Sequence, residues 1–254
     1  MPNQLKFILP DRAVIEQAAQ GEKSYAIFNY YGRGPITKAK LHRFHRALKL
    51  GATVQTRRVI DMGVADGVLL PTLAHHYDHV AAIDIHEEIL QRSRRLVDSL
   101  GLKNIDVVNS SDISTDQLRQ RLGGGYGLMY LLETLEHVGS QPDIWGSKIA
   151  FLKDCFALLE PDGRIIISVP KMVGFPLLIK NVLQRGLGVG YDSLTWGQVL
   201  KSTFLKNTDD LEPHWNGGHK GFNHIKLERH LHQHFTVHHQ SSSSITVFYV
   251  IGRK

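Results

Sequence analysis

The chain has 254 residues, of which 42% are hydrophobic and 21% charged, so its composition excludes a fibrous repeat and an intrinsically disordered chain. Its only cysteine, Cys155, excludes an intrachain disulfide and a zinc centre built from cysteines. The net charge of +6 is concentrated in residues 1–58, where 11 basic and 3 acidic side chains give +8. Because the sequence contains neither a signal-peptide pattern nor a long uncharged run, we expect a cytoplasmic protein.

The N-terminal stretch predicts short helical elements. Asp11 is a suitable N-cap residue, and Gly21 can stop a helix in a left-handed conformation, so we expect a helix between them. Residues 24–35 are aromatic and then rich in turn-forming residues, which indicates a connector or lid. Within it, Tyr30 and Tyr31 are candidates for covering a substrate, although packing of their rings in the core is the more ordinary role.

Thr37–Leu50 is the main basic element. Its apolar side chains recur at helical spacing on one face, and its lysines and arginines occupy the other faces. We therefore expect residues 1–52 to form a basic helical segment or lid. The charge suits an anionic partner, but a solvated helix face explains it equally well.

The stretch from Val59 to Leu70 reads VIDMGVADGVLL, which is the pattern of a buried strand, a tight turn and the start of a helix. Gly63 and Gly67 allow the backbone to approach a ligand closely. A diphosphate would be repelled by the carboxylates of Asp61 and Asp66, whereas a cationic ligand would be attracted. The loop therefore predicts a nucleotide-type cofactor that carries positive charge.

Alternating strands and helices follow this loop. Asp84 ends the next predicted strand, 23 residues after Asp61, where a carboxylate can accept hydrogen bonds from ribose hydroxyls. NAD-binding folds use the same device, so Asp84 indicates a nucleoside without choosing the cofactor. The remaining strands are expected at 105–108, 126–132, 164–170, 235–237 and 245–251, with a turn at 159–163 and helices at 69–76, 88–100, 149–159 and 225–234.

Residues 171–222 are too long for an ordinary connection and predict an insertion. It contains the apolar segment Phe175–Leu183 and a helical candidate from Tyr191 to Leu205. Its apolar character suits an organic or lipid-like ligand, although packing would require similar residues.

Histidines are concentrated near the C-terminus, where eight of the 15 lie from His214 onward. His230, His232 and His234 follow one another at a spacing of two on a predicted helix, so they cannot face one ion. We therefore expect no metal site.

Several motifs occur in the order typical of one family. They are the D-x-G-x-x-x-G loop from Asp61, Asp84 at the next strand end, the triplet L-E-H at 135–137, and L-E-P-D-G at 159–163 before a strand. The chain thereby resembles the class I S-adenosylmethionine-dependent methyltransferases, in the branch of small-molecule and ubiquinone-biosynthesis enzymes. It departs from their pattern at Ala65 and Asp162, where glycine is usual, and at Gly127, where aspartate is usual.

The resemblance implies an α/β fold with a Rossmann-like, seven-stranded and mostly parallel sheet that ends in an antiparallel hairpin. It implies a core over residues 53–254, with the insertion covering the substrate. It also implies that S-adenosylmethionine is the cofactor, with Asp84 at the ribose and Asp112 and Ile113 at the adenine. The cofactor contacts expected in full are Asp61, Gly63, Ala65, Gly67, Asp84, Ile85, Asp112, Ile113, Leu132 and Glu133.

For the acceptor, the segment from His214 to His224 resembles a loop that small-molecule methyltransferases place over the substrate. Trp215 and Phe222 join Tyr30 and Tyr31 as substrate candidates, and His137 or His219 is the candidate base. The expected reaction is methyl transfer to an oxygen, nitrogen or carbon atom of a small organic or lipid-like acceptor. Peripheral contact with a membrane is compatible with this expectation.

Three other functions remain open on sequence alone. The basic N-terminal segment is compatible with an RNA-directed methyltransferase. The strand-end aspartates are compatible with an NAD-dependent oxidoreductase. The substitutions at Ala65 and Gly127 are compatible with a protein that binds the cofactor without catalysis.

Overall fold

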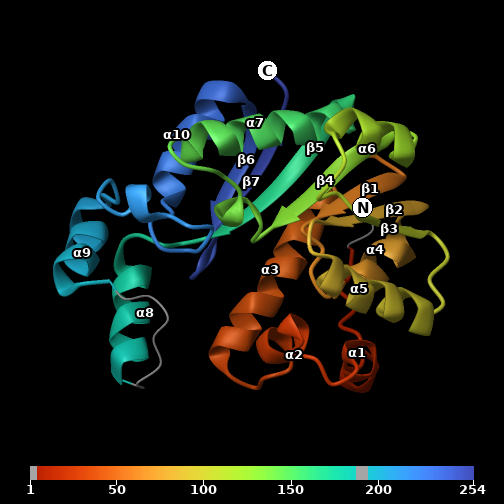
Figure 1. Ribbon diagram of the computed structural model, residues 1–254, viewed down its shortest axis with the longest axis horizontal. Coiled ribbons are helices and arrows are strands. Elements are labelled where there is room, and N and C mark those ends of the chain that lie inside the picture. The colour runs from red at the N-terminus through yellow and green to blue at the C-terminus, as the bar shows by residue number, and fades with distance from the viewer. Residues whose placement is uncertain (1–4, 187–193) are drawn as a thin grey trace. The chain divides into compact units, whose positions relative to one another are not determined.

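The computed structural model describes residues 5–186 and 194–254 (Figure 1). Within them, seven strands form one sheet in the order β3-β2-β1-β4-β5-β7-β6. β1 is parallel to β2 and β4, β2 is parallel to β3, and β6 and β7 are antiparallel. This topology confirms the expected fold class. The strands are β1 (Arg58–Met62), β2 (His79–Asp84), β3 (Ile105–Asn109), β4 (Tyr126–Leu132), β5 (Leu159–Pro170), β6 (Thr236–Ser242) and β7 (Thr246–Gly252).

Helices alternate with the parallel strands, as the sequence pattern predicts. None of the helices in the described ranges has the length and apolar character that a membrane span requires. The α-helices are α1 (Arg12–Ala19), α2 (Tyr25–Tyr30), α3 (Pro35–Gly51), α4 (Leu70–His76), α5 (Glu87–Ser99), α6 (Thr115–Leu122), α7 (Ile144–Ala157), α8 (Phe175–Gly186), α9 (Trp196–Leu200) and α10 (His224–His234). Shorter helical turns are η1 (Leu135–His137), η2 (Lys201–Leu205) and η3 (Glu212–His214).

The carboxyl ends of β1, β2 and β3 are held together by backbone hydrogen bonds. The register pairs Met62 with Ile83, and the Gly63 amide donates to the Ile83 carbonyl at 2.8 Å. The Ser110 amide donates to the Asp84 carbonyl at 2.9 Å. Because β2 and β4 lie on opposite sides of β1, the chain reverses its winding direction there, and ligands of open α/β sheets bind at such a switch point.

The structure differs from the expected elements in four places. Residues 25–30 are helical, and α6 is an additional helix that begins with a capping box at Ser114 and Gln117. β5 begins at Leu159, so the expected turn at 159–163 is wrong, and β6 extends to Ser242 through its pairing with β7. Local sequence patterns missed the greater length of β5 and β6, because pairing with a neighbouring strand, and not local propensity, determines where a strand begins and ends. The expected helix from Tyr191 begins outside the described residues, which show α9 and η2 from Trp196 onward.

The chain divides into two compact units. The first comprises Met1–Leu132, Asp154–Ile167 and Arg253, and the second comprises Glu133–Lys153, Ser168–Gly252 and Lys254. In the first unit, α1 packs beside α5 (Figure 1), and Arg95 on α5 donates a hydrogen bond to the carbonyl at the end of α1. The basic N-terminal segment thus belongs to the unit that contains β1 to β4. A boundary after residue 52 stays a prediction.

Candidate active site

The loop after β1 has an unusual backbone because three alternate residues adopt positive φ. Gly63, Ala65 and Gly67 have φ values of 80°, 49° and 77°. Such values are natural for glycine, whereas they cost an alanine about 1–2 kcal/mol because its Cβ crowds the backbone. The Ala65 amide donates to Oδ2 of Asp84 at 3.2 Å, and its carbonyl accepts from the Ser93 hydroxyl. These contacts hold Ala65 in the conformation that the missing glycine would adopt freely.

Two acidic side chains lie beneath and beside this loop. Asp61 is buried at the end of β1, and burial, followed by the nearby charge of Asp84, raises its pKa to about 7. Asp84 accepts hydrogen bonds from the amides of Ile85 and His86 through Oδ1. It does not cap α5, whose N-cap residue is His86. The carboxylate of Asp84 therefore connects the loop after β1 with the loop after β2.

Asp66, by contrast, has a structural role within the chain. Its carboxylate is buried and accepts hydrogen bonds from the Ser24 hydroxyl at 2.7 Å, the Ala26 amide at 2.8 Å and Nε of Arg92 at 2.9 Å. Because Arg92 compensates its charge, Asp66 does not contribute to repulsion of a diphosphate as the sequence interpretation assumed. It instead fastens the start of α2 to the cofactor loop.

Other predicted cofactor contacts, among them the adenine candidates Asp112 and Ile113, lie at or after the carboxyl ends of β2, β3 and β4. The Ile85 side chain is 56% exposed, directly after Asp84. Asp112 is exposed in a turn and accepts a hydrogen bond from the Ser111 hydroxyl, and Ile113 is half-buried. Leu132 is half-buried at the end of β4. These positions belong to the first unit and follow neighbouring strands of the sheet, as expected for one nucleoside site.

In the second unit, the two predicted catalytic histidines lie together, although 82 residues separate them. The ring centroids of His137 and His219 are 4.8 Å apart, and the rings meet edge to face. Both side chains are partly exposed. The carboxylate of Glu136, which is fully buried, lies close to both rings. Oε1 of Glu136 is 4.0 Å from Nε2 of His137 and 3.9 Å from Nδ1 of His219. We call these three residues the Glu136 cluster.

Lys148 supports this cluster and was missed by sequence reasoning. Its buried ammonium group donates hydrogen bonds to the carbonyls of Leu135, Glu136 and Val138, so it holds the turn η1 in place. Burial lowers its pKa to about 8, and the charge of Glu136 acts in the opposite direction. The sequence gives little indication that Lys148 is buried, because a lysine on a helix is usually exposed.

A family comparison agrees with this geometry. A family model described as a methyltransferase domain matches residues 36–247, which is most of the chain. This chain belongs to that methyltransferase family.

Curated relatives of this methyltransferase include ubiquinone biosynthesis O-methyltransferases. It is 27% identical over 146 residues to the protein of Bordetella avium and 28% identical over 138 residues to that of Acinetobacter baylyi. These matches cover 54% and 53% of this chain, and 56% and 54% of the relatives. The chain thus spans about half the length of the curated relatives it matches.

Solved structures confirm the fold of the methyltransferase. Magnesium protoporphyrin IX methyltransferase of Synechocystis, solved with S-adenosylhomocysteine, has a TM-score of 0.57 at 16% identity, covering 96% of this chain and 100% of that one. N-methyltransferase NodS of Bradyrhizobium japonicum, solved with the same compound, has a TM-score of 0.55 at 11% identity, covering 95% and 97%. The fold is therefore the Rossmann-like fold of S-adenosylmethionine-dependent methyltransferases.

Packing explains why this methyltransferase has Gly127 where the family usually has aspartate. A Cβ at Gly127 would lie 2.8 Å from both Cβ and Oγ1 of Thr56, and the Gly127 amide donates to that same Oγ1. Gly127 is the second residue of β4, at the opposite end of the strand from Leu132. The departure thus concerns the packing at the start of the strand, not the cofactor loop.

The predicted substrate residues of the methyltransferase have structural contacts. The Tyr30 hydroxyl accepts a hydrogen bond from Arg43, and the Tyr31 hydroxyl donates one to the Pro10 carbonyl. Trp215 and Phe222 are buried beneath the ammonium group of Lys148. Their roles at a substrate stay predictions. Likewise, Glu133, at φ 53°, accepts a hydrogen bond from Ser168, and its cofactor role stays a prediction.

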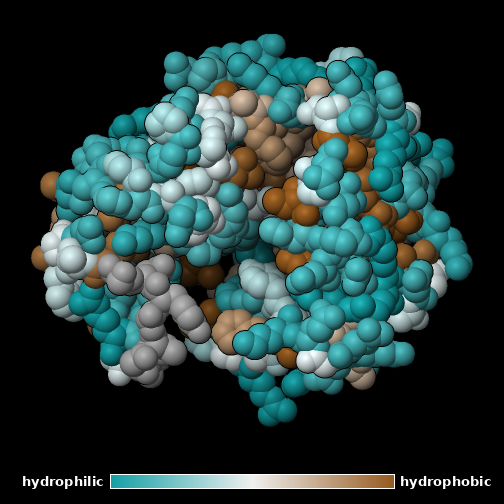
Figure 2. All heavy atoms as spheres, in the orientation of Figure 1, coloured by the Kyte–Doolittle hydropathy of each residue, from teal (hydrophilic) through white to brown (hydrophobic). Residues whose placement is uncertain are grey.

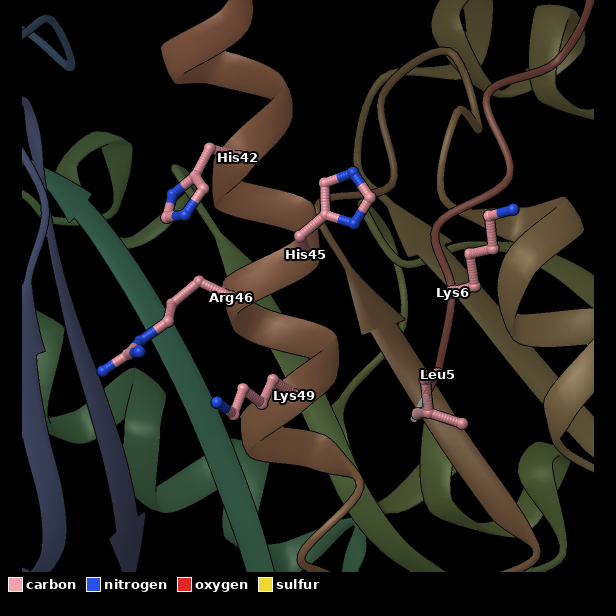
Figure 3. Close-up of a pocket in the computed structure, with 6 residues that line it drawn as sticks. All are labelled: Leu5, Lys6, His42, His45, Arg46 and Lys49. Atoms are coloured by element: carbon pink, nitrogen blue, oxygen red, sulfur yellow. The ribbon is translucent and has the colours of Figure 1, made fainter. Parts of the chain in front are cut away.

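The basic N-terminal segment forms a hollow of about 490 Å³ on the first unit (Figure 3). Four of its lining residues project from α3, and the other two belong to the segment before α1. Five of the six are basic or histidine, and none is acidic. They are Leu5, Lys6, His42, His45, Arg46 and Lys49. The charge suits an anion, and an anionic partner is one of the two interpretations that the sequence left open.

Proposed function

We propose that this protein transfers a methyl group from S-adenosylmethionine to an oxygen, nitrogen or carbon nucleophile of a small organic or lipid-like acceptor, as an enzyme of class EC 2.1.1.-. The observation that carries the proposal is the left-handed loop after β1, with Asp61 buried at its start and Asp84 hydrogen-bonded to its backbone. The family match favours this reaction over an NAD-dependent oxidation or a silent binding role.

The residues present fit this cofactor. A carboxylate can accept about four hydrogen bonds. The Asp84 carboxylate accepts three, from the amides of Ala65, Ile85 and His86, so it can accept a further one from a ribose hydroxyl without rearrangement. The exposed Ile85 offers an apolar surface for an adenine ring. Bound S-adenosylmethionine supplies an electrophilic methyl carbon on a positively charged sulfur, and the buried Asp61 favours a cationic ligand. The protein otherwise contributes alignment of the acceptor with the methyl carbon.

Thermal-shift measurements with S-adenosylmethionine, S-adenosylhomocysteine and NAD test the cofactor assignment. The wild type should be stabilised by the first two and not by NAD, because ligands that bind the native state raise the melting temperature. Asp84→Ala should lose this stabilisation. Asp98→Ala, which removes an exposed carboxylate from α5 in the same unit, is the matched control and should respond like the wild type. Equal stabilisation of Asp84→Ala and wild type would show that the assignment is wrong.

An exposed apolar surface on the insertion supports a lipid-like acceptor. Apolar side chains interrupt the hydrophilic surface where Figure 1 places α9, as Figure 2 shows. Phe204 and Leu205, on η2 directly after α9, are 62% and 73% exposed. The others of this apolar surface are Phe175, Ile179, Val182, Leu183, Trp196 and Leu200. A monomeric protein rarely leaves so many large apolar side chains exposed without a ligand or surface to cover them.

We further propose that this surface makes peripheral contact with a membrane on the cytoplasmic side, where an apolar acceptor would be dissolved. Co-sedimentation with phospholipid vesicles tests this idea. The double variant Phe204→Ser, Leu205→Ser should lose vesicle binding. Phe28→Ser removes a side chain that is 85% exposed in the other unit and serves as the control. If wild type and both variants remain in the supernatant, contact with the membrane is excluded.

A further inference from the structure

The Glu136 cluster has the composition and spacing of a metal site, and we infer that Glu136, His137 and His219 bind a divalent transition-metal ion such as Zn²⁺, Mn²⁺ or Fe²⁺. One carboxylate and two imidazoles form a common ligand set for these ions. The prediction of no metal site considered only the run from His230 to His234. The structure instead brings together histidines from η1 and from the loop before α10.

The distances support coordination over hydrogen bonding. Oε1 of Glu136 lies 4.0 Å and 3.9 Å from the two facing imidazole nitrogens, which is too long for a hydrogen bond. Metal–ligand bonds of about 2.0–2.2 Å allow two ligands of one ion to be separated by up to roughly 4.2 Å. The potential ligand atoms of all three residues lie within 4.8 Å of one another. A small rotation of a partly exposed ring closes the remaining difference.

The proton position on His137 is a second, independent observation. Its Nδ1 lies 2.5 Å from the carbonyl oxygen of Gly217. Because a carbonyl oxygen only accepts, Nδ1 carries the hydrogen, and in the neutral ring, the form that binds a metal ion, Nε2 has the lone pair. Nε2 is also the nitrogen of His137 that lies 4.0 Å from Oε1 of Glu136. A ligating histidine typically donates its other ring N–H in this way, which fixes the orientation of the ring.

The surroundings give the site rigidity and an open side. Lys148 donates to three carbonyls in and after η1, those of Leu135, Glu136 and Val138, and the Glu136 side chain is fully buried, so the backbone and the carboxylate of this turn have little freedom to move. The side chains of His137 and His219 are 45% and 41% exposed, which leaves one side of the cluster open to solvent. Catalytic metal sites keep such an open position for water or substrate.

The role of the ion rests on the proposed function and adds the kind of acceptor, namely one with a hydroxyl group. Coordination lowers the pKa of a hydroxyl, whose proton passes to solvent. The acceptor oxygen then bonds to the methyl carbon while the carbon–sulfur bond breaks and its electron pair stays on sulfur. In this scheme His137 and His219 are metal ligands, so neither acts as the general base expected from the sequence.

Metal binding to the full chain tests the inference directly. The chelator-treated protein is titrated with Zn²⁺, Mn²⁺ and Co²⁺ by calorimetry, and the visible spectrum of the Co²⁺ form is recorded. We expect one ion per chain, and at least about 100-fold weaker binding in Glu136→Gln and His219→Ala. His214→Ala removes an exposed histidine of the same unit and should bind as the wild type does. Melting temperatures without metal establish that each variant is folded.

The inference fails if the wild type binds no ion, or if His219→Ala and wild type bind it equally. Should Glu136→Gln not fold, His219→Ala and His137→Ala still decide the question, because both rings are partly exposed. The thermal shift with S-adenosylmethionine is measured in parallel. Loss of that shift would refute the proposed function, whereas loss of metal binding alone would refute only the metal site. Activity that depends on both histidines but not on metal would support the general-base role and overturn this inference.

Discussion

The binding of S-adenosylmethionine should tighten as the pH rises through 7, because Asp61 must be ionised to attract a cationic ligand. Burial and the charge of Asp84 raise the pKa of Asp61 to about 7. About a tenth of the protein therefore carries this charge at pH 6 and about nine tenths at pH 8. If the ionised form is the one that binds, the apparent affinity increases about tenfold between these values. Asp61→Asn is isosteric and should show no such increase.

Calorimetric titration of wild type and Asp61→Asn at pH 6, 7 and 8 measures this difference. The ligand's own ionisation affects both proteins equally, so the ratio of their dissociation constants isolates Asp61. A ratio that stays constant across the pH range would refute the reasoning. A carboxylate near a bound cation has its pKa lowered by about 1–3 units, so binding at pH 6 should also release protons from the wild type. Repeating the titration in buffers of different ionisation enthalpy detects that release.

The remaining predictions concern stability. Because the pKa of Asp61 is raised in the native state, the native state binds this proton more tightly than the unfolded state does. The free energy of unfolding should therefore fall as the pH rises from about 4 to about 7. Urea denaturation should show this decrease in the wild type and not in Asp61→Asn. Asp66→Ala leaves the guanidinium of Arg92 and the Ser24 hydroxyl without their buried acceptor and should lower the free energy of unfolding by about 3–5 kcal/mol, while a loss below about 1 kcal/mol would contradict the clamp. Gly127→Ala should lower the free energy of unfolding by about 1–3 kcal/mol through overpacking against Thr56. Thr56→Gly in the same chain removes both close contacts and should recover more of this loss than Thr56→Ala, which keeps the contact with Cβ; equal effects of the two would mean that the strain lies elsewhere.

Local sequence patterns predicted the seven strands in their order along the chain, but not α2 and α6. β4 begins and ends at the predicted residues, because a seven-residue apolar run between glycines and Glu133 is short for a helix and typical of a buried strand. Asp11 caps α1 as expected, since its carboxylate accepts from the Ala13 amide. The alternation of strands and helices predicted the parallel sheet, and four motifs in the expected order carried the resemblance to the family.

Tertiary structure alone decided how the charged side chains are used. Asp61, Asp66 and Asp84 look alike in the sequence, but one is buried with a raised pKa, one is fastened to Arg92, and one connects two loops. The same limit applies to the Glu136 cluster. His137 and His219 were each visible as candidates, but their distance from Glu136 depends on long-range folding that no local pattern encodes. Local periodicity reports which face of an element is buried, whereas a site depends on which residues distant in the chain meet, and only the folded chain determines that.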